Sequence, residues 1–124
     1  MGKLIQYSVA ASVLLCSSTW VAAESLVVKT VEQVYAEQQA LSGQRIVVKG
    51  SVTKVNNNIM GKNFLHIHDG TGGEGADDLT VTSQQTANVG DELSVEALVT
   101  TDRDFGYGYT YSLILEEAKL TPIK

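Results

Sequence analysis

Apolar residues alternate with polar ones through most of the chain after Gly43, which is the pattern of half-buried β-strands. This alternation predicts five strands, at residues 45–55, 63–69, 78–82, 92–101 and 109–117. The apolar parity of these strands forms the expected core: Ile46, Val48, Val52, Leu65, Ile67, Leu79, Val81, Leu93, Val95, Ala97, Val99, Tyr109, Tyr111, Leu113 and Leu115. Gly50 interrupts the long first strand where a small barrel needs a bulge or bend. The pattern therefore predicts an all-β barrel.

One segment before the strands has helical periodicity. Mostly apolar residues recur at the i, i+3, i+4, i+7 spacing from Val31 to Leu41. Thr30 and Gln33 have the spacing of a capping box, and Gly43 supplies a stop. Because a single short helix is marginal alone in water, we expect its apolar stripe to pack on the sheet. The predicted architecture is one N-terminal helix followed by a five-stranded barrel.

Residues 1–23 have the composition of a secretory signal peptide. Lys3 stands in a short head, an apolar run covers 4–15, and small residues end the segment at Ala23. Cys16 suggests a lipoprotein anchor as an alternative, but the residue before it is not the small one that such signals carry. We expect cleavage after Ala23, a periplasmic location, and no membrane span in the domain at residues 24–124.

The composition of that domain limits the kinds of partner that it is expected to bind. Removing 23 of the 124 residues leaves 101, the size of one domain, and takes away the only Cys and Trp. No disulfide can then form, so the hydrophobic core must hold the fold. Loss of Lys3 changes the net charge from −5 to −6. This charge opposes binding to phosphate backbones and anionic lipids, so nucleic acid is an unfavoured ligand.

A partly open five-stranded barrel with a bent first strand is the pattern of the OB-fold. From about residue 30 onward, the chain resembles small secreted bacterial OB-fold proteins related to the tRNA-anticodon-type nucleic-acid-binding domains. The resemblance lies in the runs VKGSVTKVNNNIMGKNFLHIHDGTG, DLTVT, VGDELSVEALV and DFGYGYTYSLILEEA. It implies a binding or accessory module, and some relatives look like accessory proteins of periplasmic respiratory systems. A periplasmic protein partner in a respiratory or envelope system is therefore expected.

The sequence gives little support for catalysis. The domain has no Cys nucleophile, no G-x-S-x-G elbow and no glycine-rich phosphate loop opening a helix. Its paired carboxylates, such as Asp77 with Asp78, are adjacent and point to opposite faces of a strand. We expect a binding protein that is not an enzyme.

The run IMGKNFLHIHDGTG at residues 59–72 contains both histidines of the chain. His66 and His68 are two residues apart on one strand face, with Cα atoms about 7 Å apart, so both imidazoles can reach one ion. Met60 can add a thioether and Phe64 can shield the ion, a set that suits copper, above all Cu(I). The simpler interpretation leaves both histidines on the surface and Met60 in the core.

Two loops complete the candidate sites. Residues 69–78, DGTGGEGADD, lack the EF-hand spacing, so we expect a flexible hairpin loop instead of a calcium site. Aromatic residues on an OB face can stack bases or sugars, and the candidate face here is Phe64, Arg103, Phe105 and Tyr107. Acidic residues flank the single arginine, so an oligonucleotide is less expected than a sugar, peptide or protein. Core packing around a glycine turn is the alternative.

Overall fold

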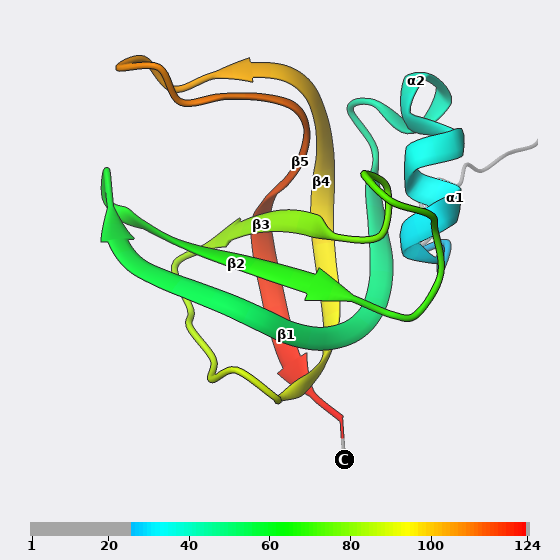
Figure 1. The fold of residues 1–124 in the computed structure, drawn as a ribbon, viewed down its shortest axis with the longest axis horizontal. Coiled ribbons are helices and arrows are strands. Elements are labelled where there is room, and N and C mark those ends of the chain that lie inside the picture. Colours follow the sequence, from blue (N-terminus) through cyan, green and yellow to red (C-terminus); the bar gives the residue numbers. More distant parts are fainter. Residues whose placement is uncertain (1–25, 124) are drawn as a thin grey trace, which may run out of the picture.

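The computed structural model describes residues 26–123, and the predicted signal peptide at residues 1–23 lies outside them. Five strands form a closed barrel in the order β1-β2-β3-β5-β4 (Figure 1). Their bounds are Arg45–Ile59 for β1, Lys62–His68 for β2, Leu79–Ser83 for β3, Glu92–Asp104 for β4 and Thr110–Pro122 for β5. All neighbouring pairs are antiparallel except β3 with β5. The predicted all-β, five-stranded OB-type fold is confirmed. Within residues 26–123, no helix is both long and apolar enough to cross a membrane.

The bend of β1 lies at the glycine that the sequence predicted. Up to Ser51, β1 pairs with β4, and from Ser51 onward it pairs with β2. A Cβ atom on Gly50 would come within 2.7 Å of the carbonyl oxygen of His68, so only glycine allows this close approach. One strand therefore serves both sides of the barrel (Figure 1).

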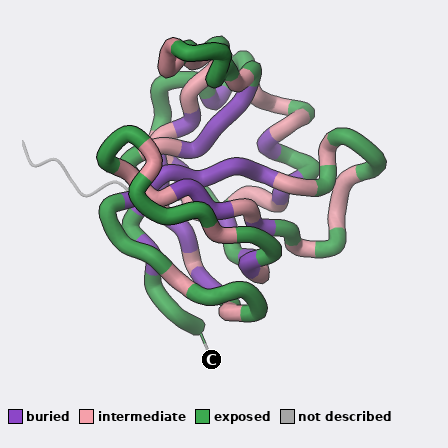
Figure 2. Tube along the Cα trace, turned by 60° about the vertical axis from the view of Figure 1, so that its left-hand side comes forward, coloured by how far each residue is buried: buried purple, intermediate pink, exposed green. Residues whose placement is uncertain are grey.

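The barrel interior contains most of the predicted core, and buried residues lie mainly along the middle of the strands (Figure 2). Tyr109 and Tyr111 are the exceptions, because the β4–β5 hairpin leaves the barrel before it reaches them. Ala118 and Leu120 are buried in their place. An extra residue at Glu117, where φ is +52°, shifts the inward parity of β5 after Leu115.

Two short helices, α1 (Val31–Ala36) and α2 (Gln38–Leu41), replace the single predicted helix. The break comes at Glu37, whose φ and ψ of −112° and 17° are not helical. The capping box of Thr30 and Gln33 is present. Both helices bury apolar side chains in the core at one end of the barrel (Figure 1).

The loop after β2 also fixes the start of α1. The Asp69 carboxylate accepts a hydrogen bond from the Val31 N–H at 2.9 Å, and the Thr71 hydroxyl oxygen accepts one from the Glu32 N–H at 3.0 Å. The beginning of the glycine-rich segment therefore has a structural role, satisfying two of the free N–H groups at the helix end.

Candidate functional site

The candidate site is the outer face of β2 and β3, together with two hairpins that extend beyond the barrel on the same side (Figure 1). The β1–β2 hairpin turns at Met60 and Gly61, and the β4–β5 hairpin turns between Phe105 and Tyr109. OB-folds bind ligands on this face and on these two connections.

Three aromatic rings connect the β4–β5 hairpin to β2. The Phe64 ring centroid lies 5.6 Å from that of Phe105 and 6.2 Å from that of Tyr111, and the last two are 6.0 Å apart. These separations suit edge-to-face and tilted aromatic packing. Phe64 is on the outward parity, as predicted, but its neighbours cover it and leave it only 4% exposed. It therefore fixes the hairpin and offers little surface to a ligand or an ion.

Arg103 is held by the same hairpin. Its guanidinium lies 4.3 Å from the centre of the Phe105 ring, and its Nε donates to Glu116 at 2.9 Å. The second oxygen of Glu116 accepts a hydrogen bond from the Thr100 hydroxyl at 2.9 Å. The charge of Arg103 is thus compensated within the protein, which weakens the expectation that it binds an anionic polymer.

A groove of about 260 Å³ lies between the two hairpins. It is lined by Asn56, Ile59, Phe64, His66, Tyr109 and Tyr111. Aromatic surface with a few convergent polar groups is the usual composition of a small-ligand site. Asn56 and Ile59 were not predicted, because the sequence does not reveal how far β1 continues beside β2.

His66 has a fixed orientation in this groove. Its Nδ1 lies 2.7 Å from an Asp78 carboxylate oxygen, and the backbone oxygen of Asp78 accepts the Tyr35 hydroxyl at 2.5 Å. Burial, followed by the negative charges of Asp78 and Asp77, raises the pKa of Tyr35, so its hydroxyl remains protonated and keeps donating. In a neutral His66 this contact places the proton on Nδ1 and leaves Nε2 as a hydrogen-bond acceptor.

Met60 lies at the β1–β2 turn, whereas His66 and His68 lie near the other end of β2, with His68 as its exposed last residue. Met60 is exposed at the turn, with φ of +53°, so the alternative that it packs in the core is also wrong. The turn is followed by Lys62, the first residue of β2. His66 is four residues further along the strand, which separates the two Cα atoms by roughly 13 Å. Among the described residues, no group of three or more His, Cys, Asp or Glu side chains is arranged to hold a metal. A copper site formed by Met60, His66 and His68 remains a prediction that this spacing does not favour.

The ends of the two hairpins carry exposed apolar surface. Tyr107 is 94% exposed, with φ of +55°, and Met60 and Tyr109 are also exposed. Sequence reasoning placed Tyr109 in the core by extending the alternation of β5 too far. The glycines on both sides of Tyr107, each with positive φ, mark the turn at which that alternation ends.

No protein-family model and no curated protein matches the sequence. Among solved structures, a protein assigned as an aspartyl-tRNA synthetase from Leishmania major Friedlin matches with a TM-score of 0.58 and 14% sequence identity. The match covers 90% of this chain and 23% of that protein, so the chain spans about a quarter of its length. At this identity the likeness shows the fold alone. It supports the predicted relation to OB-type domains and leaves the secreted bacterial family as a resemblance of the sequence.

Proposed function

We propose that the protein is a non-catalytic binding module that acts in the periplasm through a protein partner. The observation that carries this proposal is the exposed apolar surface at the ends of both hairpins, on the face that OB-folds use for ligands. Tyrosine and methionine are enriched at protein interfaces. A tyrosine that is 94% exposed, as Tyr107 is, offers a large contact area to a partner.

The charges around this surface favour a protein over a nucleic acid. Asp102 and Asp104 flank Arg103, which is paired with Glu116, and the whole chain has a net charge of −5. A neutral or basic protein surface is complementary to this arrangement. The assignment to a respiratory or envelope system rests on the resemblance of the sequence to small secreted OB-fold proteins.

Site-specific photocrosslinking tests the proposed surface. A benzophenone amino acid at position 107 should give one main adduct in cells that produce the exported protein. Position 89 is the matched control, because Val89 is also apolar and 66% exposed but lies in the loop between β3 and β4. Tyr107→Ala should then weaken binding of the identified partner at least tenfold, and Val89→Ala should not. Equal adducts at both positions, or none at position 107, would contradict the proposal.

Export needs its own measurement. The native protein from a periplasmic fraction should have the mass of residues 24–124, without residues 1–23. Full-length protein confined to the cytoplasm would refute the proposed location.

A sugar is the second candidate ligand, and the fixed orientation of His66 favours it. Held by Asp78, the His66 imidazole lines the groove with its second ring nitrogen free of this contact, and Asn56 and Tyr109 supply further polar groups. Oligosaccharide binding that is lost in Asn56→Ala and His66→Ala, yet kept in Tyr107→Ala, would identify the groove as a sugar site. Loss in Tyr107→Ala alone would favour the hairpin ends.

A further inference from the structure

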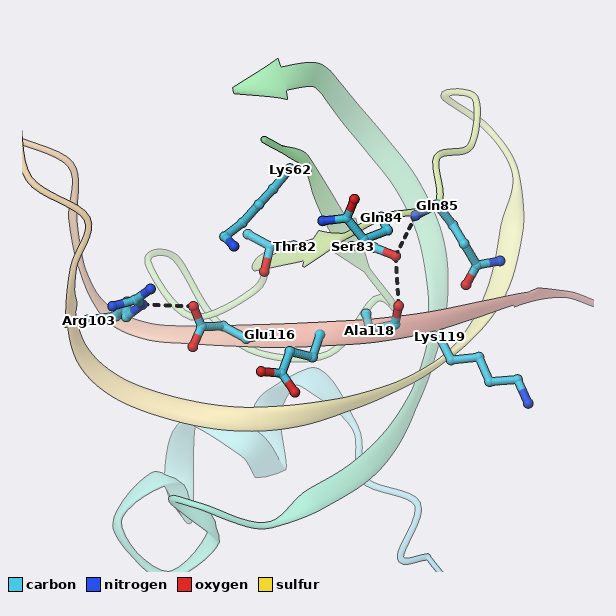
Figure 3. A pocket seen from close by; sticks show the side chains of 10 residues that line it. Lys62, Thr82, Ser83, Gln84, Gln85, Arg103, Glu116, Ala118 and Lys119 are labelled. Atoms are coloured by element: carbon cyan, nitrogen blue, oxygen red, sulfur yellow. Dashed lines mark hydrogen bonds and ion pairs between the residues drawn. The ribbon is translucent and has the colours of Figure 1, made fainter. Parts of the chain in front are cut away.

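A second pocket, of about 380 Å³, lies between β3 and β5 (Figure 3). It exists because these strands share only one paired position, Val81 with Leu115. Beyond that position the strands are bridged by side chains. The Ser83 hydroxyl donates to the Ala118 carbonyl at 2.7 Å.

The Gln85 side chain completes this bridge. Its carboxamide oxygen accepts from the Leu120 N–H at 2.8 Å, and its nitrogen donates to the Leu120 carbonyl at 3.1 Å. The free edge of β5 is therefore satisfied by side chains, as an added strand would satisfy it. The Ala118 carbonyl and both Leu120 backbone groups are therefore satisfied without a ligand.

One buried polar group in this pocket remains available. Thr82 is only 2% exposed, and its hydroxyl makes no hydrogen bond to any residue within 26–123. Figure 3 shows its side chain pointing into the space over β5. Buried hydroxyl groups in native proteins nearly always have a protein, water or ligand partner, so this one can donate to a polar ligand atom.

The charged side chains of the pocket indicate the chemical class of its ligand. Lys62, Arg103 and Lys119, three of the nine Lys and Arg residues of this acidic chain, line it. Lys62 forms no ion pair with the described residues, and Figure 3 shows its side chain directed into the pocket. Arg103 is neutralised by Glu116, and Glu117 also has no ion-pair partner in the described part of the chain.

We propose that this pocket binds a small zwitterion of the α-amino-acid type. Its carboxylate accepts hydrogen bonds from the Lys62 ammonium and the Thr82 hydroxyl, and its ammonium group faces Glu117. Figure 3 shows the Lys119 side chain directed away from Thr82, and Arg103 is neutralised, so one positive charge on Lys62 and one negative charge on Glu117 remain. This balance suits a singly charged carboxylate next to an amine and opposes a phosphate dianion. The exposed residues at the hairpin ends, Met60, Tyr107 and Tyr109, do not line this pocket.

An NMR titration tests this site. Free amino acids are added to the protein that contains residues 24–124, and the chemical shifts of its backbone amides are recorded. The twenty amino acids are added first as mixtures and then singly, with acetate and inorganic phosphate as comparison ligands. At least one amino acid should shift the amides of residues 82–85 and 116–119 in a saturable way, and acetate should bind more weakly. Phosphate binding as tight as that of the best amino acid would overturn the proposed ligand class.

Three variants locate the binding. Thr82→Val keeps the side-chain shape and removes only the unpaired hydroxyl, and Lys62→Gln removes the free ammonium group. Each should weaken the best amino acid at least tenfold. Lys54→Gln makes the same charge change outside the pocket and should leave affinity unchanged, as should Tyr107→Ala. Equal weakening by Lys54→Gln and Lys62→Gln, or no saturable shift with any amino acid, would refute the site.

Discussion

Asp69 connects two parts of the chain that are 38 residues apart, because its carboxylate accepts the Val31 N–H at the start of α1. Burial alone would raise the pKa of this carboxyl. Hydrogen bonds from the Thr71 hydroxyl, the Val31 N–H and the Thr71 N–H outweigh that effect and lower the pKa below its ordinary value of 3.8. The ionised side chain therefore stabilises the folded state.

Asp69→Ala should lower the free energy of unfolding at pH 7 by about 1 kcal/mol, the usual cost of losing a helix cap. Because the folded pKa lies below the unfolded one, the stabilisation is present above about pH 4 and is lost as pH falls through the folded value. Urea unfolding at pH 7 and pH 2.5 measures this. Glu74→Ala, an exposed acid in the same loop, is the control. A difference between wild type and Asp69→Ala that is equally large at both pH values would contradict the assignment.

Contacts between residues that are a few positions apart in the sequence could be predicted. Contacts between residues on either side of a long loop could not. The capping box of Thr30 and Gln33 follows from a spacing of three residues, and it is present. Asp78 reaches His66 across a glycine-rich loop whose path no local pattern specifies. The predicted partners of His66 were therefore Met60 and His68, the nearest candidates in sequence.

At the scale of elements, the position of the β4–β5 hairpin determines which side chains form the ligand face. Its ring contacts to Phe64 hold Phe105 and Tyr111 against β2, and Tyr111 becomes part of the groove wall. Alternation predicted the strands themselves, because each strand has one apolar face. It did not predict where the hairpin leaves the barrel, since this depends on packing between residues about 40 positions apart.

Phe105→Ala should loosen this hairpin without unfolding the barrel. The change removes the edge contact with Phe64 and the Arg103 contact, with an expected loss of roughly 2 kcal/mol in unfolding free energy. Hydrogen exchange should speed up most at the amides of residues 102–111. Tyr107→Ala is the matched control in the same hairpin, because its ring is almost entirely exposed. Unchanged exchange in Phe105→Ala would show that the ring cluster does not hold the hairpin.

At the scale of the whole molecule, the architecture was more predictable than the site. Five alternating strands and a glycine at the bend of β1 specify a small barrel with few alternatives. The predicted ligand face was Phe64, Arg103, Phe105 and Tyr107, and in the structure Phe105 contacts both Phe64 and Arg103. Tyr107 is by far the most exposed of the four, whereas Phe64 is buried and Arg103 is paired with Glu116. Residue types indicated an unusual surface, but their mutual packing determined which side chains stay available.

At the same scale, the fold and the net charge of the protein lead to opposite expectations about nucleic acid binding. The solved structure that matches is assigned as a tRNA synthetase, but a shared fold does not determine a ligand. This chain has a net charge of −5, and on the ligand face Arg103 is paired with Glu116. A surface with few unpaired cations gains little affinity from counterion release.

Fluorescence anisotropy with a labelled single-stranded 20-nucleotide RNA should therefore show no micromolar binding at about 150 mM salt. Weak association at about 10 mM salt is compatible with this expectation, because screening is then small. Replacing both Asp102 and Asp104 with lysine makes the hairpin basic and should produce salt-sensitive binding, if charge is the barrier. Micromolar binding by the wild-type protein at about 150 mM salt would show that the aromatic face recognises nucleic acid despite its charge.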